Sequence, residues 1–523
     1  MNETSLKYLD ETNIKVHSSD LEVHKLISDH FTFMVPGYKF SPKFKAGIWD
    51  GKIRLYNLST KLLPIGLLKS LMRLLSSNNI QFSVDKELSP FSGLDLSEID
   101  KFIQGLNLHA RGVPVEAKNY QIAAVKEALK NKKKLLLSPT SSGKSMILYI
   151  YIRYQIDVLG NDVVLIVPTT QLVEQMYEDF KDYSSGNEWP VDEISCRIYA
   201  GKEKLLDRRL VISTWASIVS IMKRDRKSTE VILNKTGALC CDEAHQYKAE
   251  VVSEMCAKFN KTQWKLGVTG TIDESSKVNV LQLTGLFSEP TTVISTKELQ
   301  DRGVVSRADI RVTLLEYPEY VREKITKGSD WDKEKDFLIT NPYRNSFIAD
   351  LAMNCTGVTL ILFTYIGKHG DLLFKELESK ASEYGAKRQI KYIHGQTDIE
   401  DREEVRALAK EEDIIILASS SLFSTGTNIP AIENIIFAMP TKSSIRVRQS
   451  IGRGLRLSKN KTSCRVFDIA DDLRYENYTN STYRQMLSRL DIYRAEEFDF
   501  SIKPVKLKYP DQISDGPSLL PLG

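Results

Sequence analysis

The stretch LCCDEAHQ, at residues 239–246, brings together side chains that could do chemistry: two cysteines, two carboxylates and a histidine. All five are possible metal ligands. Neighbouring residues of a strand point to opposite faces of a sheet, however, so Cys240 and Cys241 would not converge on one ion. A structural zinc site also needs further ligands at a suitable spacing, and none stands nearby in the sequence. We therefore expect the cysteines to fill a buried strand and the two acids to act as a pair.

A second stretch, SPTSSGKS at residues 138–145, follows an apolar run and precedes a helix-like one. Successive N–H groups at the start of a helix bind phosphate oxygens. Lys144 would neutralise the β- and γ-phosphates of ATP, and the Ser145 hydroxyl would reach Mg²⁺. The strict pattern has glycine at the position of Ser138, so an ordinary serine- and glycine-rich turn is the competing interpretation. The residues expected to contact ATP here are Pro139, Thr140, Ser141, Ser142, Gly143, Lys144 and Ser145.

The acidic pair would supply the other half of such a site. Asp242 stands at the end of an apolar run, where it would hold Mg²⁺ through the water shell of the ion. Glu243 would orient and deprotonate the attacking water. With Ala244 and His245 these residues spell DEAH. The metal expected at this stretch is therefore Mg²⁺ that arrives with ATP, and His245 is expected to couple the nucleotide site to TGT (269–271) or to a second domain.

These residues need a sheet to position them, and the pattern of the chain predicts one. Short runs that are apolar throughout, typical of strands covered on both faces, alternate with longer amphipathic stretches. Strands are expected at 134–139, 163–168, 210–214, 238–243 and 265–270. After a highly charged stretch at 319–337, which indicates a solvated helix or an insertion, further strands are expected at 359–365, 390–395, 413–420, 434–440 and 465–471. This alternation of strands and helices predicts two doubly wound α/β domains in tandem, each with a parallel sheet.

Length and composition are those of an ordinary globular protein with several domains. The chain has 523 residues, of which 42% are hydrophobic and 27% charged. We expect a small α+β domain at 1–105, α/β domains at 106–300 and 301–475, and a short helical tail at 476–523. The net charge of +4 means that any nucleic acid must bind to local basic surfaces. Six cysteines without a CxxC pair fit a reducing cytosol, and neither a signal peptide nor a membrane span is expected.

Over residues 115–470 the chain resembles the DEAH-box helicases of superfamily 2, because the other motifs of that family appear in order. The resemblance implies two RecA-like domains that bind Mg·ATP in a shared cleft. Gln121 would read adenine, and Gly426 in FSTGTNIP would contact the nucleotide. Arg453 and Arg456 in QSIGRGLR would stabilise the charge that develops on the γ-phosphoryl group. TGT stands where most members have Ser-Ala-Thr, and the residues to which position gives a coupling role are Thr269, Thr271 and Gln449.

Hydroxyl side chains follow several of the predicted strands and suit contacts to phosphates that ignore base sequence. In open α/β sheets, ligands bind at the carboxyl ends of the strands. Taken singly, each of these residues is more simply explained as an ordinary turn or helix-cap residue. As a set, they predict a groove that tracks a nucleic-acid strand, and its members are Thr169, Thr170, Thr214, Thr364, Thr397, Ser424 and Thr425.

The segment at 37–73 has eight lysines and arginines, one acid and five interleaved aromatics. Basic charge binds phosphates, and aromatic rings stack on bases or wedge between them. WDG, at 49–51, is expected to be a tight turn between strands at 40–48 and 52–56. The alternative is a small domain with core aromatics and solvated lysines. The residues expected to contact nucleic acid are Lys43, Lys45, Trp49 and Lys52, and the segment is similar to one in bacteriophage helicases of recombination and repair.

The function expected from these features is that of an ATP-dependent DNA helicase. The resemblance implies remodelling of branched DNA by fork regression and branch migration, and unwinding of R-loops. The expected partners are branched or single-stranded DNA, RNA–DNA hybrids, and recombination or replication proteins. We expect a monomer in the cytoplasm, that of the host cell if a phage encodes the chain. The alternatives are a DEAH-class RNA helicase, the motor subunit of a restriction-type complex, and an ATPase that does not translocate.

Overall fold

The structure is a computed structural model that describes residues 4–88, 95–199, 207–248, 250–272, 277–326, 330–386, 388–420, 429, 431–439, 443–458 and 461–510. The chain divides into two compact units, Met1–Ser295 and Thr296–Gly523. Each is built on one large parallel sheet. Across the described parts of both units, no helix combines the length and the apolar character that crossing a bilayer requires.

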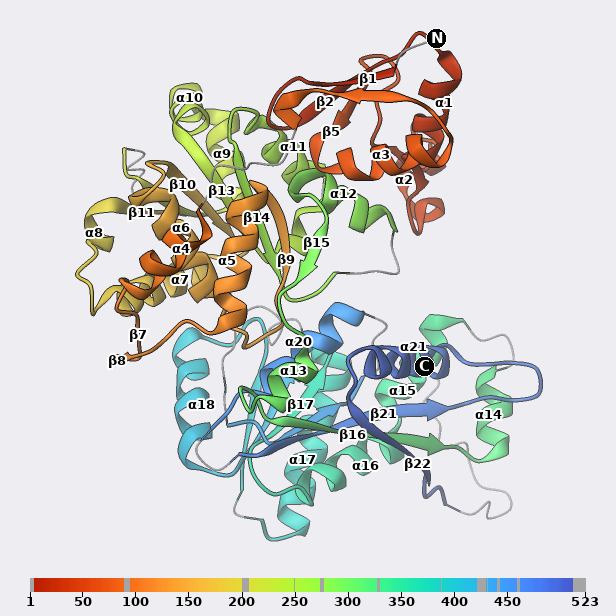
Figure 1. The fold of residues 1–523 in the computed structure, drawn as a ribbon. Helices are drawn as coiled ribbons and strands as arrows, with labels where there is room; N and C mark the ends of the chain where they lie inside the picture. The colour runs from red at the N-terminus through yellow and green to blue at the C-terminus, as the bar shows by residue number, and fades with distance from the viewer. Residues whose placement is uncertain are drawn as a thin grey trace. The chain divides into compact units, whose positions relative to one another are not determined.

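The sheet of the first unit has seven parallel strands in the order β11-β12-β10-β13-β14-β9-β15 (Figure 1). Five of them confirm the predicted strands, and the edge strands β11 (Ser195–Ile198) and β15 (Pro290–Thr292) were not predicted because each is short and lacks an apolar run. The five are β9 (Lys133–Leu137), β10 (Asp162–Val167), β12 (Leu210–Thr214), β13 (Thr236–Asp242) and β14 (Trp264–Thr269).

Helices cover both faces of this sheet. On one face lie α5 (Asn119–Asn131), α6 (Lys144–Asp157) and α7 (Thr170–Ser184). On the other lie α9 (Trp215–Arg224), α11 (Glu250–Lys258) and α12 (Lys277–Phe287). Cys240 packs into the first of these cores and Cys241 into the second. The expectation that the two thiols point to opposite faces is therefore confirmed, and both are free thiols buried in the hydrophobic cores.

The amino-terminal part of the first unit is a small α+β structure. Its sheet has the order β5-β2-β1-β6, with β1 (Thr4–Tyr8), β2 (Asn13–His17), β5 (Leu62–Pro64) and β6 (Phe82–Val84). The amphipathic helices α1 (Leu21–His30) and α3 (Leu68–Ser77) contribute Ile27, Leu71 and Leu75 to its core. The expected α+β character is thus present, with a hydrophobic core of its own.

The predicted strand at 40–48 is wrong. These residues form a 3₁₀ turn (Tyr38–Phe40) and the short helix α2 (Pro42–Lys45). Pro42 occupies the first helical position, where its fixed φ favours the helix, and Gly47 follows with a φ of 68°. The strand β4 (Lys52–Arg54) pairs instead with β3 (Thr32–Met34), so residues 35–51 form an excursion between two paired strands.

The small α+β part packs directly onto the sheet of the same unit. Lys265 on β14 donates hydrogen bonds from its Nζ to the carbonyl oxygen of Glu11 at 3.0 Å and to Thr12 Oγ1 at 3.1 Å. The Glu11 side chain pairs with Lys133 on β9. A Cβ added to Gly66 would collide with the carbonyl oxygen of Thr284 on α12. Because of these contacts, the segment expected as a separate domain at 1–105 shares a compact unit with the first sheet.

The second unit repeats the plan with seven parallel strands in the order β18-β19-β17-β20-β21-β16-β22. The predicted strands are confirmed as β17 (Thr359–Phe363), β18 (Gln389–Ile393), β19 (Ile414–Ser419), β20 (Asn434–Phe437) and β21 (Ser463–Asp472). The charged stretch forms α14 (Glu319–Thr326) and α15 (Trp331–Thr340). β16 (Arg307–Glu316) was not predicted.

The expected helical tail contains α21 (Ser481–Ala495), but the chain continues into β22 (Asp499–Lys506). β22 pairs with β16 and completes the edge of the sheet. Arg489 on α21 is buried against Asp468 on β21, with hydrogen bonds of 2.8 and 2.7 Å. The tail is therefore an integral part of the second sheet domain.

Candidate nucleotide site

The candidate phosphate loop connects β9 to α6. Gly143 caps the amino end of α6 in the left-handed conformation, with a φ of 81°, and a Cβ at this position would collide with the Gln121 amide. Ser141 also has a positive φ, 68°, which residues other than glycine rarely adopt and which clusters at ligand sites. The loop therefore needs a glycine at 143 and leads directly to the amino end of a helix.

Two side chains of α5 brace this loop from outside. Tyr120 Oη and Gln121 Nε2 each donate a hydrogen bond to the carbonyl oxygen of Ser142 at 3.0 Å. Within the loop, Ser138 Oγ lies 2.6 Å from Ser142 Oγ, so the serine that replaces the usual glycine has a structural partner. The adenine-reading role of Gln121 stays a prediction, and bracing by Tyr120 and Gln121 was not expected from the sequence.

Lys144, Asp242 and Glu243 come together because β13, β14 and β9 are neighbours and end at the same edge of the sheet. Lys144 Nζ lies 3.4 Å from the Ser138 carbonyl oxygen and 3.8 Å from Glu243 Oε1. A Cβ on Gly270, in the TGT segment, would lie 3.5 Å from the same ammonium group. Three of the five predicted catalytic groups thus lie at one edge of the sheet with TGT.

The buried Asp242 carboxylate has the character of a cation ligand. Its Oδ1 atom has no hydrogen-bond partner among the residues that the structure describes. Burial, and after it the nearby Glu243 carboxylate, raises the pKa of Asp242 to about 7, against the lowering effect of Lys144. A buried carboxylate oxygen without a donor fits an arriving divalent cation, and oxygen ligands are those that Mg²⁺ prefers. The residues that would hold Mg²⁺ are Asp242 and Ser145.

Ser145 has a partner that the sequence did not indicate. Its Oγ lies 2.7 Å from Tyr183 Oη, near the carboxyl end of α7. Burial, the largest cause, raises the pKa of the Tyr183 phenol well above its ordinary value, so the group is neutral at physiological pH. The pairing brings together residues 38 positions apart in the sequence.

His245 contacts the TGT segment directly. Its Nδ1 lies 2.8 Å from Thr269 Oγ1 and 3.3 Å from Glu243 Oε2. Thr269 Oγ1 in turn donates to the carbonyl oxygen of Thr271 at 3.0 Å. The coupling role of these residues stays a prediction, but contacts run from Glu243 through His245 to TGT.

In the second unit, Gln449 and Arg453 lie on α20 (Ser444–Gly454), and Arg456 follows the helix. All three are half-buried. The Arg456 carbonyl oxygen accepts a hydrogen bond from Lys461 Nζ at 3.1 Å. Their proposed roles at a shared nucleotide stay predictions. Gly426, Ser424 and Thr425 lie outside the residues that the structure describes.

The predicted strand-tracking hydroxyls that the structure describes follow the carboxyl ends of strands, and several have local partners. Thr169 and Thr214 cap α7 and α9, accepting from the N–H groups of Leu172 and Ser217. Thr397 Oγ1 accepts from the N–H of His394 at 2.9 Å. Thr170 opens α7, and Thr364, which follows β17, is exposed. Their nucleic-acid contacts stay predictions, since capping alone explains some of them.

The excursion at 35–51 presents the predicted lysines to solvent. Lys43, Lys45 and Lys52 are all exposed. Trp49 is half-buried, and its Nε1 donates a hydrogen bond to the Lys52 carbonyl oxygen at 2.8 Å, so it stabilises the turn. Phe40, one of the five interleaved aromatics, is 82% exposed, and Ile48, which was not predicted, is 78% exposed. No periodicity could have shown this exposure, because both flank a helix of four residues.

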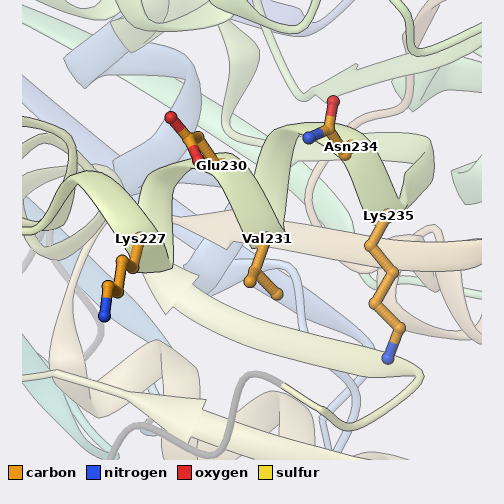
Figure 2. Close-up of a pocket in the computed structure, with 5 residues that line it drawn as sticks. All are labelled: Lys227, Glu230, Val231, Asn234 and Lys235. Atoms are coloured by element: carbon orange, nitrogen blue, oxygen red, sulfur yellow. The ribbon is translucent and has the colours of Figure 1, made fainter.

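An open hollow lies elsewhere on the first unit, along α10 (Arg226–Lys235) (Figure 2). Its lining comes from that one helix: Lys227, Glu230, Val231, Asn234 and Lys235. α10 leads into the amino end of β13, whereas Asp242 stands at the carboxyl end. The hollow therefore has no part in the nucleotide site. Within the described ranges, no group of three or more His, Cys, Asp or Glu residues could hold a metal by itself.

Comparison with known families finds three matches along the chain. Residues 3–85 match the amino-terminal domain of DNA helicase UvsW. Residues 114–274 match the type III restriction enzyme res subunit, and residues 346–458 match the helicase conserved C-terminal domain. Together they follow the order of the small α+β part, the first sheet and the second sheet.

Individual relatives extend the likeness over most of the chain. The ATP-dependent DNA helicase uvsW of Enterobacteria phage T4 is 28% identical over 512 residues, which is 95% of this chain and 98% of the relative. The crystal structure of T4 UvsW matches with a TM-score of 0.50 and 27% identity, covering 97% of this chain and 100% of that one. The DUF1998 helicase MrfA bound to DNA matches 79% of this chain and 56% of its own, with a TM-score of 0.52 and 13% identity. That last likeness concerns the fold alone.

Proposed function

Because the chain belongs to the superfamily 2 helicases, which use ATP and bind nucleic acid, we propose that it is an ATP-dependent DNA helicase that remodels branched DNA. The observation that carries the proposal is the meeting of Lys144, Asp242 and Glu243 at one sheet edge. There the ammonium group binds phosphates, Asp242 holds Mg²⁺, and Glu243 activates water.

The chain's own residues divide the work of hydrolysis. The phosphate loop and the amino end of α6 bind and orient the phosphates. Glu243 Oε1 lies 3.8 Å from Lys144 Nζ, and this carboxylate stands beside the phosphate loop, where it accepts a proton from water. Mg²⁺ supplies charge neutralisation at the phosphates when it binds with ATP. Arg453 and Arg456 of the second unit stabilise the transferring γ-phosphoryl group, and closure of the two sheet domains on ATP drives movement along the strand.

The nucleic-acid surface has two parts. The hydroxyls at the carboxyl ends of the strands, with Thr169, Thr170 and Thr214 in the first unit, contact the backbone of one strand. The basic excursion at 35–51 engages duplex or junction DNA through its exposed lysines. Phe40 and Ile48 stand among these lysines and pack against unstacked bases at a junction. The similarity to a helicase of a bacteriophage supports action in the host cytoplasm. There the protein acts as a monomer on recombination and replication intermediates.

The proposal is tested by ATP hydrolysis measured with single-stranded, duplex, forked, four-way and R-loop substrates. We expect weak hydrolysis by the protein alone and strong stimulation by branched or single-stranded DNA. Hydrolysis that does not depend on nucleic acid would refute a motor function. Stimulation by RNA alone would favour an RNA helicase. Cleavage of DNA by the purified chain would favour a subunit of a restriction-type complex. The observation that favours this second candidate is the match of residues 114–274 to the type III restriction enzyme res subunit.

A further inference from the structure

The hydroxyl groups of Ser145 and Tyr183 form a contact between α6 and α7, although the two residues are 38 positions apart in the sequence. Ser145 is the second residue of α6 and a proposed Mg²⁺ ligand. Tyr183 lies near the carboxyl end of α7, and the two hydroxyl oxygens are 2.7 Å apart. A hydroxyl that ligates a cation through a lone pair must direct its proton elsewhere, and Tyr183 Oη is within reach to accept it.

The surroundings hold the tyrosine hydroxyl in place. The Tyr183 ring packs edge-on against Tyr149 of α6, with the ring centroids 5.5 Å apart. Tyr149 also packs against Phe180 of α7 at 5.4 Å. Because this aromatic contact joins one helix to the other, the position of Tyr183 follows the position of α7 relative to α6.

The other end of α7 stands at the edge where a nucleic-acid strand is proposed to bind. Thr169 caps the helix and Thr170 is its first residue. The helix has 15 residues and so spans about 22 Å. A rigid helix of this length links a proposed nucleic-acid contact at its amino end to the Ser145 hydroxyl at its carboxyl end.

We propose that Tyr183 is a positioning residue that orients the Ser145 hydroxyl for Mg²⁺, and that α7 thereby links nucleic-acid binding to the nucleotide site. The inference rests on the proposed ATP site and adds a residue and a route to it. Tyr183 contacts neither phosphate nor metal itself, and it acts through Ser145.

The test is equilibrium binding of a fluorescent ATP analogue at increasing Mg²⁺ concentration, with the full chain and without turnover. In Tyr183→Phe the ring packing stays and only the hydroxyl is lost. We expect the half-saturating Mg²⁺ concentration to rise about tenfold, the lower end of the effect of removing a partner of a metal ligand. Single-stranded DNA should lower that concentration in the unchanged protein and should not do so in the variant.

The matched control is Tyr177→Phe, which removes a phenol hydroxyl from the same helix. The Tyr177 hydroxyl donates to Asp192, away from Ser145. This control should bind the analogue at the same Mg²⁺ concentration as the unchanged protein. In a Ser145→Ala background, Tyr183→Phe should have no further effect.

An unchanged Mg²⁺ dependence in Tyr183→Phe, with the same melting temperature, overturns the positioning role. An equal shift caused by DNA in the variant and in the unchanged protein overturns the link through α7. If Tyr183→Phe lowered the melting temperature and still shifted the Mg²⁺ dependence in the Ser145→Ala background, its effect would be merely structural. That result would also overturn the positioning role. Failure of the proposed helicase is distinguishable, because it would appear in the unchanged protein as hydrolysis that ignores nucleic acid.

Discussion

His245 Nδ1 lies 2.8 Å from Thr269 Oγ1, and this contact joins the segment that carries Asp242 and Glu243 to the end of β14, where TGT begins. The same Thr269 hydroxyl donates to the Thr271 carbonyl oxygen, so its orientation is set from both sides. His245 also lies 3.3 Å from Glu243, so we expect this single side chain to carry changes at the proposed nucleotide site to TGT.

His245→Ala should separate hydrolysis from unwinding. The catalytic groups Lys144, Asp242 and Glu243 stay in place, so we expect basal hydrolysis to change little. The stimulation of hydrolysis by DNA should fall about tenfold, within the range of coupling free energies between sites, and strand separation should fall with it. The measurement is ATPase activity and unwinding of a forked duplex in parallel. Thr269→Val should have a similar effect, and fully additive losses in the double variant would contradict a shared contact.

Lys144→Ala should abolish ATP hydrolysis, because the ammonium group is the cation beside the phosphate loop and Glu243. Binding to DNA in a gel shift should remain measurable. Lys126→Ala is the matched control, since Lys126 lies on α5 and pairs with Asp100 away from the site. If Lys144→Ala lost DNA binding and hydrolysis equally, the assignment of the phosphate loop would be wrong or the variant misfolded.

Arg456→Ala should lower kcat by about 10³-fold with little change in the affinity for ATP, as expected when an arginine that stabilises the transferring phosphoryl group is removed. The measurement is steady-state hydrolysis with saturating DNA, together with binding of an ATP analogue. Arg446→Ala, on an exposed position of α20, provides the comparison. An unaltered kcat in Arg456→Ala would refute the sharing of ATP between the two sheet domains.

Stability should rise with pH above about 8 because of Lys265. Burial, the largest cause, lowers the pKa of this lysine to about 8, whereas the unfolded chain keeps an ordinary value near 10.5. Between these values the unfolded state binds more protons, so the free energy of unfolding increases with pH, by about 1.4 kcal/mol per pH unit. Below pH 8 the lysine is charged in both states and contributes no slope. Urea unfolding at several pH values should show this increase, and Lys265→Met should remove it. The same slope in both proteins would assign it to other groups.

The triple change of Lys43, Lys45 and Lys52 to Ala should flatten the salt dependence of duplex binding. Each phosphate contact contributes about 0.9 to the slope of log K against log salt, so the slope should fall by up to about 3. Phe40→Ala should keep the slope and weaken only the binding of forks and junctions, since its ring is apolar. Leu21→Ala, 75% exposed on α1, is the matched control for an exposed apolar side chain. An unaltered slope in the triple variant would mean that these lysines are merely solvated.

Much of the fold could be predicted because parallel strands buried on both faces read as continuous apolar runs, such as LVIST at 210–214. The edge strands escaped prediction because β11 and β15 are short and lack such a run. β22 escaped for a related reason: it alternates, and its side chains are largely exposed. The error at 40–48 has a different cause. Apolar residues occupy every second position there as in a strand, while Pro42 and Gly47 favour a short helix between two turns.

The sequence by itself determined the chemistry of the nucleotide site: a lysine after a glycine-containing loop, two adjacent acids at a strand end, and a histidine two residues further on. Local patterns can specify these because each depends on residue type and on short spacing. Only the tertiary structure decided which residues from distant parts of the sequence contact these groups. Tyr120 and Gln121 brace Ser142, Tyr183 meets Ser145, and His245 meets Thr269. Those pairings depend on strand order and helix packing, which bring together segments whose spacing in the sequence carries no signal.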